Sequence, residues 1–145
     1  NRPRVVEFSK DGEFAYVTAE IGGSVSVIET EGHSVVETID LGLDSRPVEI
    51  AVDPDGSRLF VAGGGTSSVY VIDTATNEVI QTISEQMGRR PWGIAITPDG
   101  SRVFTANGLS DSVSVIDTDS LTVINNIAVG RGAHSVEIGL VPSNE

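Results

Sequence analysis

The chain has 145 residues, which is room for one ordinary domain, and 39% of them are hydrophobic but only 5% aromatic. Twenty-one Asp and Glu against nine Lys and Arg give a formal net charge of −12, which repels phosphate backbones, so nucleic acid is not expected as a partner. The sequence has no Cys, which excludes a disulfide scaffold and a thiolate metal site.

A repeat of 44 residues runs through the chain. Pro3, Pro47 and Pro91 stand at this interval, and the second and third copies are identical at 22 of 44 positions. Agreement at this level predicts one structural unit repeated in series. In chain order the copies cover residues 2–45, 46–89 and 90–133, and residues 134–145 begin another.

Within each copy the apolar residues alternate with a period of two, and polar turns interrupt them every 8 to 12 positions. This pattern predicts four strands per copy and no helix. The first two strands of the third copy are joined by residues 98–100, Pro-Asp-Gly, a tight hairpin turn in which Gly supplies a positive φ. The strands predicted in this copy cover residues 91–97, 102–107, 112–117 and 122–129.

Several predicted strands carry apolar side chains on both faces, for example Val71 beside Ile72 and Val115 beside Ile116. This is typical of a sheet that neighbours cover on both sides. A four-stranded unit of this length that cannot bury both faces alone is the blade of a β-propeller. The sequence therefore predicts an all-β fold, a propeller segment of three antiparallel blades and the first strand of a fourth.

Three motifs at the ends of the second strands resemble a known repeat. They are Tyr16-Val17-Thr18-Ala19, Phe60-Val61-Ala62-Gly63 and Phe104-Thr105-Ala106-Asn107, each followed by a strand of the form Val-x-Val-Ile-(Asp or Glu)-Thr. Over the whole chain these motifs resemble the YVTN-type β-propeller repeat, although Ala19 and Gly63 replace its Asn. Residues 90–100 are most similar to propeller proteins associated with PQQ-dependent alcohol catabolism. The resemblance implies a periplasmic or extracellular protein and an association with PQQ. The motifs themselves place no cofactor within this segment.

Three blades cannot close a ring, because propellers close with about four to eight blades. We expect this segment to belong to a seven-bladed ring that the remaining blades of the same chain, or self-association, complete. The chain begins Asn-Arg-Pro-Arg, without an initiator Met or an apolar signal region, and no stretch approaches 18 apolar residues. We therefore expect a mature chain or a cut piece, without a membrane span.

The leading residues of the four copies are Arg2, Arg46, Arg90 and His134. The first strand of each propeller blade lines the central channel, so these side chains are expected around the channel mouth. Guanidinium groups bind carboxylates and phosphates bidentately, which predicts a small anionic ligand or a protein partner on this face. The competing interpretation is that the Arg side chains bridge adjacent blades through carboxylates or carbonyls.

Other candidate residues lie near the same mouth. Trp92 begins an inner strand and is expected either to pack between blades or to stack on a planar ligand. Residues 63–65, all Gly, would allow a ligand to approach the backbone closely, and Asn107 lies in the equivalent loop of the third copy. Glu49 and Glu137 share one repeat position on inner strands, where they are expected to pair with Arg or to hold a cation.

Other motifs are structural or absent. Asp73 and Asp117, with Glu29, end the third strands and are expected to accept hydrogen bonds from turn amides. The two His residues, His33 and His134, are 101 positions apart, so there is no zinc spacing, and His33 is expected in a solvated turn. There is no Gly-x-Ser-x-Gly motif, and the sequence identifies no catalytic residue within the segment.

Two functions are consistent with these residues. The first is a noncatalytic binding or scaffold propeller, an exported accessory of small-molecule oxidation. The second is part of a propeller enzyme, either a quinoprotein-like dehydrogenase subunit or a lactonase-like hydrolase. The lack of metal, haem and nucleophile motifs favours the first function. The second stays open, because propeller active sites collect single residues from many blades and three blades would hold only some of them.

Overall fold

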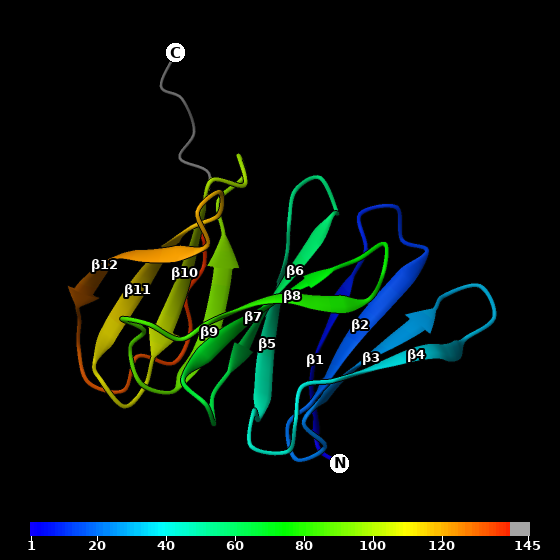
Figure 1. The fold of residues 1–145 in the computed structure, drawn as a ribbon, viewed down its shortest axis with the longest axis horizontal. Helices are drawn as coiled ribbons and strands as arrows, with labels where there is room; N and C mark the ends of the chain where they lie inside the picture. Colours follow the sequence, from blue (N-terminus) through cyan, green and yellow to red (C-terminus); the bar gives the residue numbers. More distant parts are fainter. Residues whose placement is uncertain (140–145) are drawn as a thin grey trace.

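The computed structural model describes residues 1–139 and contains three four-stranded antiparallel sheets (Figure 1). In every sheet the spatial order of the strands follows the chain. Within the described residues no helix is long and apolar enough to cross a membrane. The strands are β1 (Pro3–Phe8), β2 (Phe14–Ala19), β3 (Ser24–Glu29), β4 (Ser34–Asp40), β5 (Pro47–Val52), β6 (Arg58–Gly63), β7 (Ser68–Asp73), β8 (Glu78–Ile83), β9 (Pro91–Ile96), β10 (Arg102–Asn107), β11 (Ser112–Asp117) and β12 (Thr122–Ala128).

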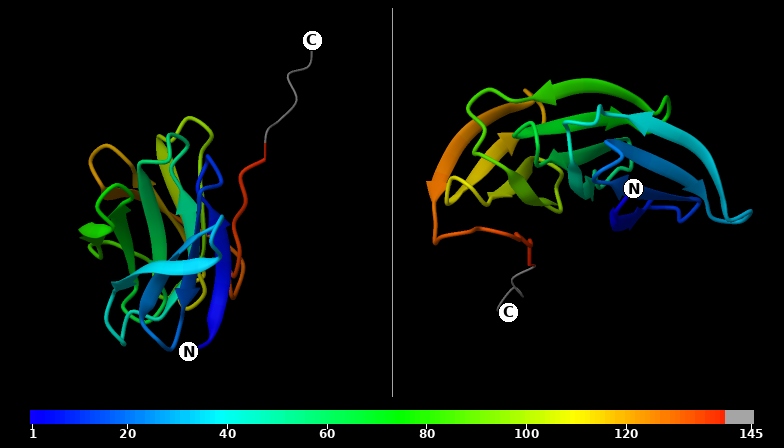
Figure 2. Two further views of the ribbon diagram at one scale, coloured as in Figure 1. Left: turned by 90° about the vertical axis from the view of Figure 1, so that its right-hand side faces the viewer. Right: turned by 90° about the horizontal axis from the view of Figure 1, so that it is seen from below.

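The three sheets are arranged as the blades of a propeller. The inner strands β1, β5 and β9 contact one another in that order. Seen from below, the outer strands β4, β8 and β12 form the convex side of an arc, and the chain after β12 crosses its concave side (Figure 2). The predicted all-β propeller fold is confirmed, and each strand predicted in the third copy agrees with the structure to within one residue.

The strand predicted from residue 134 is not formed over residues 134–139, which have no regular structure; residues 140–145 lie outside the described residues. Each inner strand of the three blades is hydrogen-bonded to the second strand of its own blade. Residues 134–139 have no such strand beside them within the described chain. His134 and Ser135 nevertheless lie against Gly93 of β9, where the next inner strand would run.

Two apolar clusters join the blades. The first lies between blades 1 and 2 and includes Val27, Leu59 and Ile72. The second lies between blades 2 and 3 and includes Phe60 and Val103, which are fully buried. Blade 2 therefore buries both of its faces, which is why its middle strands lack a polar face.

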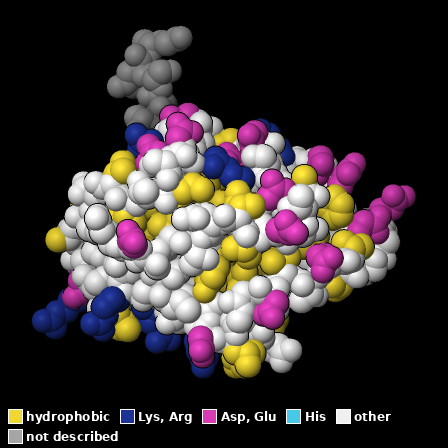
Figure 3. Space-filling view, in the orientation of Figure 1, with side chains coloured by type: hydrophobic (Ala, Val, Ile, Leu, Met, Phe, Trp, Pro, Cys, Tyr) yellow, Lys and Arg dark blue, Asp and Glu magenta, His cyan; other side chains and the backbone are white. Residues whose placement is uncertain are grey.

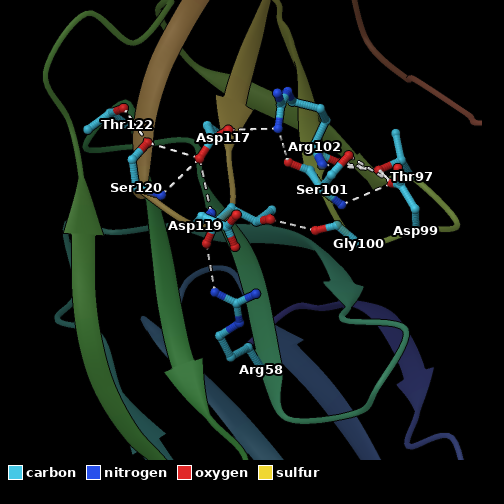
Figure 4. Close-up of polar contacts among 11 residues, drawn as sticks. Arg58, Thr97, Asp99, Gly100, Ser101, Arg102, Asp117, Asp119, Ser120 and Thr122 are labelled. Carbon is cyan, nitrogen blue, oxygen red and sulfur yellow. Dashed lines mark hydrogen bonds and ion pairs between the residues drawn. The ribbon is translucent and has the colours of Figure 1, made fainter.

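Repeated turns form one end of each blade, opposite the channel mouth. Asp73 and Asp117 accept hydrogen bonds from turn amides, and Glu29 accepts one from the Gly32 amide at 2.9 Å, as predicted. In the turn after β9, hydrogen bonds from the Thr97 hydroxyl and from Ser101 lower the pKa of Asp99 to about 2 (Figure 4). The acidic turn residues therefore stabilise local structure.

Arg58 connects two blades at the same end. Its Nη1 donates a hydrogen bond to the carbonyl of Thr118 in blade 3 at 2.8 Å (Figure 4). Its Nη2 lies 2.6 Å from Asp53 of its own blade. Arg102, at the equivalent position of blade 3, pairs with Asp117 at 2.7 Å. Arg58 thus bridges two blades at the end away from the predicted Arg positions.

Gly56→Val and Gly100→Val are each expected to destabilise the closed propeller by about 1 to 3 kcal/mol. Both glycines sit in hairpin turns with positive φ, 79° and 73°, which a β-branched residue adopts only with strain. Denaturant unfolding measures the loss. Gly130→Val is the matched control, because a side chain at Gly130 would meet nothing within 4 Å. Equal stability of all three variants would contradict the turn assignment.

Candidate functional site

Each inner strand contains a β-bulge near the end that carries the loops 20–23, 64–67 and 108–111; we call this end of the blades the mouth. On β1 the bulge contains Arg4 and Val5, and on β5 it contains Val48 and Glu49. On β9, Trp92 lies between two paired residues and has no partner of its own. Bulges bend a strand and redirect its side chains, so these residues leave the regular alternation.

The bulge residues line one cleft of about 370 Å³ between the inner strands of all three blades. Side chains from three separate copies of the repeat therefore face one space. The full lining consists of Arg2, Pro3, Arg4, Val5, Val48, Glu49, Trp92, His134 and Ser135.

Two guanidinium groups of the cleft share one carboxylate. Arg2 Nε and Arg4 Nη1 each lie 3.4 Å from Glu20 Oε2, and the Glu20 side chain is almost buried in the loop after β2. The trio carries one positive charge in excess. Guanidinium groups with spare donors suit a carboxylate or phosphate group of a ligand.

Glu49 lies in the cleft and also joins two inner strands. Its Oε2 accepts a hydrogen bond from the Ile94 amide of β9 at 3.0 Å. Burial raises the pKa of Glu49, and the charge of Glu137 acts in the same direction, while the Ile94 amide and the nearby His134 act in the opposite direction. The predicted pairing of Glu49 with Arg is not formed, and among residues 1–139 no group of three or more acidic or His side chains is placed to hold a metal ion. A carboxyl group with a raised pKa beside an imidazole can accept a proton from water.

Trp92 forms a wall of the cleft. The Arg90 guanidinium lies 5.5 Å from its ring centroid, and the His134 ring lies 5.3 Å away at a tilt of 46°. A Cβ atom added at Gly108 would come within 2.3 Å of the Trp92 ring, so only Gly fits beneath it. Trp92 therefore packs within and between blades while it faces the cleft.

The predicted site residues have different positions. Arg2, Trp92 and His134 line the cleft, as expected for the channel mouth. Arg46 and Arg90 do not belong to its lining, so their predicted convergence on one ligand is not observed. Arg46 is exposed, and Arg90 packs on Trp92.

The backbone holds the leading Arg of each blade in the same way. The three leading Arg residues all have positive φ, 59° at Arg2, 45° at Arg46 and 57° at Arg90. Each of their carbonyls accepts a hydrogen bond of 3.0 to 3.1 Å from the loop between the second and third strands of the same blade. The leading residue is thus fixed against its own blade, and the bulge two or three residues later supplies further side chains to the cleft.

Two of the positions predicted to contact a ligand make contacts within the protein instead. Asn107 is fully buried, and its side-chain amide is hydrogen-bonded to Thr105, Ser112 and Ser114 inside blade 3. The backbone at Gly65 approaches its own chain rather than a ligand, since an added Cβ would lie 2.0 Å from the Asp44 carbonyl. Both positions serve packing of the loops that lead into the blades.

Sequence reasoning missed Arg4 as a cleft residue and Glu20 as its partner. Glu20 stands where the other two copies have Gly64 and Gly108. An alignment of the three copies therefore shows a carboxylate in place of Gly in the one copy that has Arg at both its first and its third position, and this difference could have indicated the ion pairs.

The two ends of the blades differ in charge. Lys and Arg side chains lie along the lower edge of Figure 3, the mouth end, whereas Asp and Glu predominate along the right-hand side. The mouth loops carry the cations Arg2, Arg46, Arg89, Arg90 and Arg131 against the acids Glu20, Asp44, Glu85 and Asp111. The turns at the opposite end carry Asp11, Glu13, Glu31, Asp53, Asp55, Asp99 and Asp119. In a chain of net charge −12 the mouth is therefore the end that least repels an anion.

Comparison with known proteins gives one family match, over residues 2–128, to the family described as Lactonase, 7-bladed beta-propeller. No curated protein matches the sequence. Among solved structures, hydrazine synthase from Kuenenia stuttgartiensis superposes with a TM-score of 0.85 and 26% identity, covering 92% of this chain and 38% of that one. A candidate 6-phosphogluconolactonase from Bacteroides fragilis gives a TM-score of 0.80 and 24% identity, covering 92% and 40%.

A protein of unknown function from Desulfotomaculum acetoxidans gives a TM-score of 0.82 and 19% identity, covering 96% of this chain and 46% of that one. The chain thus spans less than half the length of each of these three structures. The two structures below 25% identity support the fold alone.

Proposed function

The chain belongs to the lactonase family of seven-bladed β-propellers, and from this premise we propose that the closed propeller hydrolyses a lactone that carries an anionic group. The observation that carries the proposal is the single cleft where Arg2, Arg4, Glu49 and His134 meet. The family match favours the lactonase-like alternative over the noncatalytic accessory of alcohol oxidation that the sequence placed first. Export to the periplasm and association with PQQ stay predictions.

The proposed chemistry uses groups already in the cleft. Ionised Glu49 takes a proton from water as the water oxygen attacks the lactone carbonyl carbon. The ring C–O bond then breaks, and the proton passes to the leaving alkoxide, so that the product is a hydroxy acid. Arg2 and Arg4 bind the anionic group of the substrate and hold the ring over Glu49. His134 beside Glu49 acts to lower the pKa of that carboxyl and so favours its ionised form.

We propose further that these three blades are part of a ring of seven, completed by more blades of the same polypeptide or by other copies. Val6 on the open face of blade 1 is 53% exposed, whereas Ile50 and Ile94 at the same repeat position are 3% and 4% exposed. Phe8 is exposed on the same face. These side chains would be buried by a preceding blade.

Hydrolysis of 6-phosphoglucono-δ-lactone by the closed propeller, followed by acid release in a pH-stat, tests the function. Arg4→Ala is expected to raise KM for this lactone about tenfold or more, because a hydrogen bond to a charged group contributes roughly 1.5 to 3 kcal/mol. Uncharged glucono-δ-lactone should respond much less. Arg131→Ala, an exposed residue of the same face outside the cleft, is the control.

Two results would count against the proposal. If neither lactone is hydrolysed faster than in buffer, the closed propeller is not a lactonase for this substrate class. If Arg4→Ala and Arg131→Ala change KM equally, the cleft does not bind the anionic group.

A further inference from the structure

Blade 3 contains a buried polar network that the other two blades lack. Asn107 Oδ1 accepts a hydrogen bond from Thr105 at 3.0 Å, and Nδ2 donates to Ser114 at 2.9 Å. All three residues are fully buried. The positions of Thr105, Asn107 and Ser114 are occupied in blade 2 by Val61, Gly63 and Tyr70. The same fold is thus built without the network, although burying polar groups costs free energy unless they are fully bonded.

The network extends to the segment that leads into blade 3. Ser114 Oγ accepts a hydrogen bond from the Gly88 amide at 3.0 Å and donates one to Asn126 at 2.7 Å. Asn126 Nδ2 in turn donates to the carbonyl of Gln86 at 2.8 Å. Gly88 itself packs on Asn107, since an added Cβ would lie 2.2 Å from Nδ2. Residues 86–88 are therefore held against blade 3 by side chains of that blade.

This segment ends at Arg90, which contacts the cleft wall. The Arg90 amide is bonded to the Ser67 hydroxyl at 3.1 Å, and its guanidinium lies over Trp92. Within residues 1–139 the Arg90 Nε atom is buried without a hydrogen-bond partner and no ion pair of Arg90 is formed, so the guanidinium is held in place by packing. Gly108, the residue after Asn107, lies directly against the Trp92 ring.

We propose that Asn107 is a positioning residue: its network fixes the segment 86–90 so that Arg90 and Gly108 hold Trp92 as one wall of the cleft. Asn107 touches no ligand, and it acts through Arg90 and Trp92. The effect on ligand affinity rests on the proposed function, whereas the effect on Trp92 does not.

The test uses the closed propeller and Trp92, the single Trp of this chain, as a fluorescent reporter; any Trp elsewhere in the ring is replaced by Phe. Asn107→Ala places the residue that blade 1 has at this position, Ala19, so the fold is expected to persist. The variant is expected to increase acrylamide quenching of Trp92 and to raise the Kd of 6-phosphogluconate about tenfold, roughly 1.4 kcal/mol. Asn125→Ala, the same change at an exposed neighbour on β12, should alter neither.

A double-variant cycle separates positioning from general loosening. In an Arg90→Ala background, Asn107→Ala should cause no further rise in Kd, because the pathway through Arg90 is already removed. Additive effects, or Trp92 quenching equal to that of Asn125→Ala, would overturn the proposal. If Asn107→Ala fails to fold, Asn126→Ala removes the bonds of Asn126 to Ser114 and Gln86 while Asn107 stays in place, and it should change Trp92 quenching in the same direction. If 6-phosphogluconate does not bind the unaltered propeller, the proposed function fails, and quenching alone decides the role of Asn107.

Discussion

Replacing Glu49 by Gln is expected to lower kcat for lactone hydrolysis about 10²- to 10⁴-fold, the usual contribution of a general base. Gln keeps a side-chain oxygen that can accept the hydrogen bond from the Ile94 amide, which Glu49 accepts at 3.0 Å, so the inner strands should stay joined. The amide cannot take a proton from water. Initial rates at saturating lactone measure the change, and circular dichroism checks that the fold is kept.

The pH profile gives this prediction a second readout. Burial raises the pKa of Glu49 above its ordinary value of 4.5, and the base is active only when ionised. The rate of the unaltered protein should therefore fall as the pH drops through that raised pKa, and the remaining activity of Glu49→Gln should lack this acidic limb. Glu78→Gln, on the exposed part of β8, is the control and should retain both rate and limb. A normal rate, or an unchanged limb, in Glu49→Gln would assign the base to another group.

Phe60→Ala is expected to destabilise the closed propeller by about 3 to 5 kcal/mol, the largest loss from any single core truncation here. Phe60 is fully buried in the cluster between blades 2 and 3. The Arg58 guanidinium that links these blades lies 5.3 Å from its ring centroid. Removal of the ring leaves a cavity at the interface and takes away the support of Arg58. Urea unfolding, followed by far-ultraviolet circular dichroism, measures the loss.

The matched control is Ile80→Ala on β8 of the same blade. Ile80 is half exposed, so its truncation should cost less than about 1 kcal/mol. Similar losses in the two variants would show that the interface between blades 2 and 3 contributes no more to stability than the outer surface.

The strands and turns follow from local patterns. The alternation of apolar residues with a period of two predicted the ends of strands such as β10 and β11. The Asp-Gly pairs predicted the hairpin turns, because a turn depends only on the backbone preferences of a few adjacent residues. The carboxylates of Asp73 and Asp117 likewise bond amides within three residues. Such contacts are local, so the repeat showed them three times over.

The buried network around Asn107 did not follow from the sequence. Its loop position suggested a ligand contact, while the partners Thr105 and Ser114 lie at positions that are apolar or aromatic in blade 2. Whether a polar side chain at the end of a strand faces the channel or bonds within its own sheet depends on the register of that strand with its neighbours. The structure turned Asn107 toward the sheet.

The sequence by itself determined the repeat, the all-β blades and the concentration of Arg at one end of them. Only the tertiary structure decided which of these residues form the cleft. The sequence predicted that Arg46 and Arg90 converge, because they occupy equivalent positions of the repeat. In the structure, a bulge on β1 and another on β5 turn Arg4 and Glu49 into the cleft instead. A bulge changes which residue faces the channel, but it leaves the alternation of apolar and polar residues in the sequence unchanged. The cleft also needs three inner strands to meet, and this is a contact between copies of the repeat that lie far apart in the sequence.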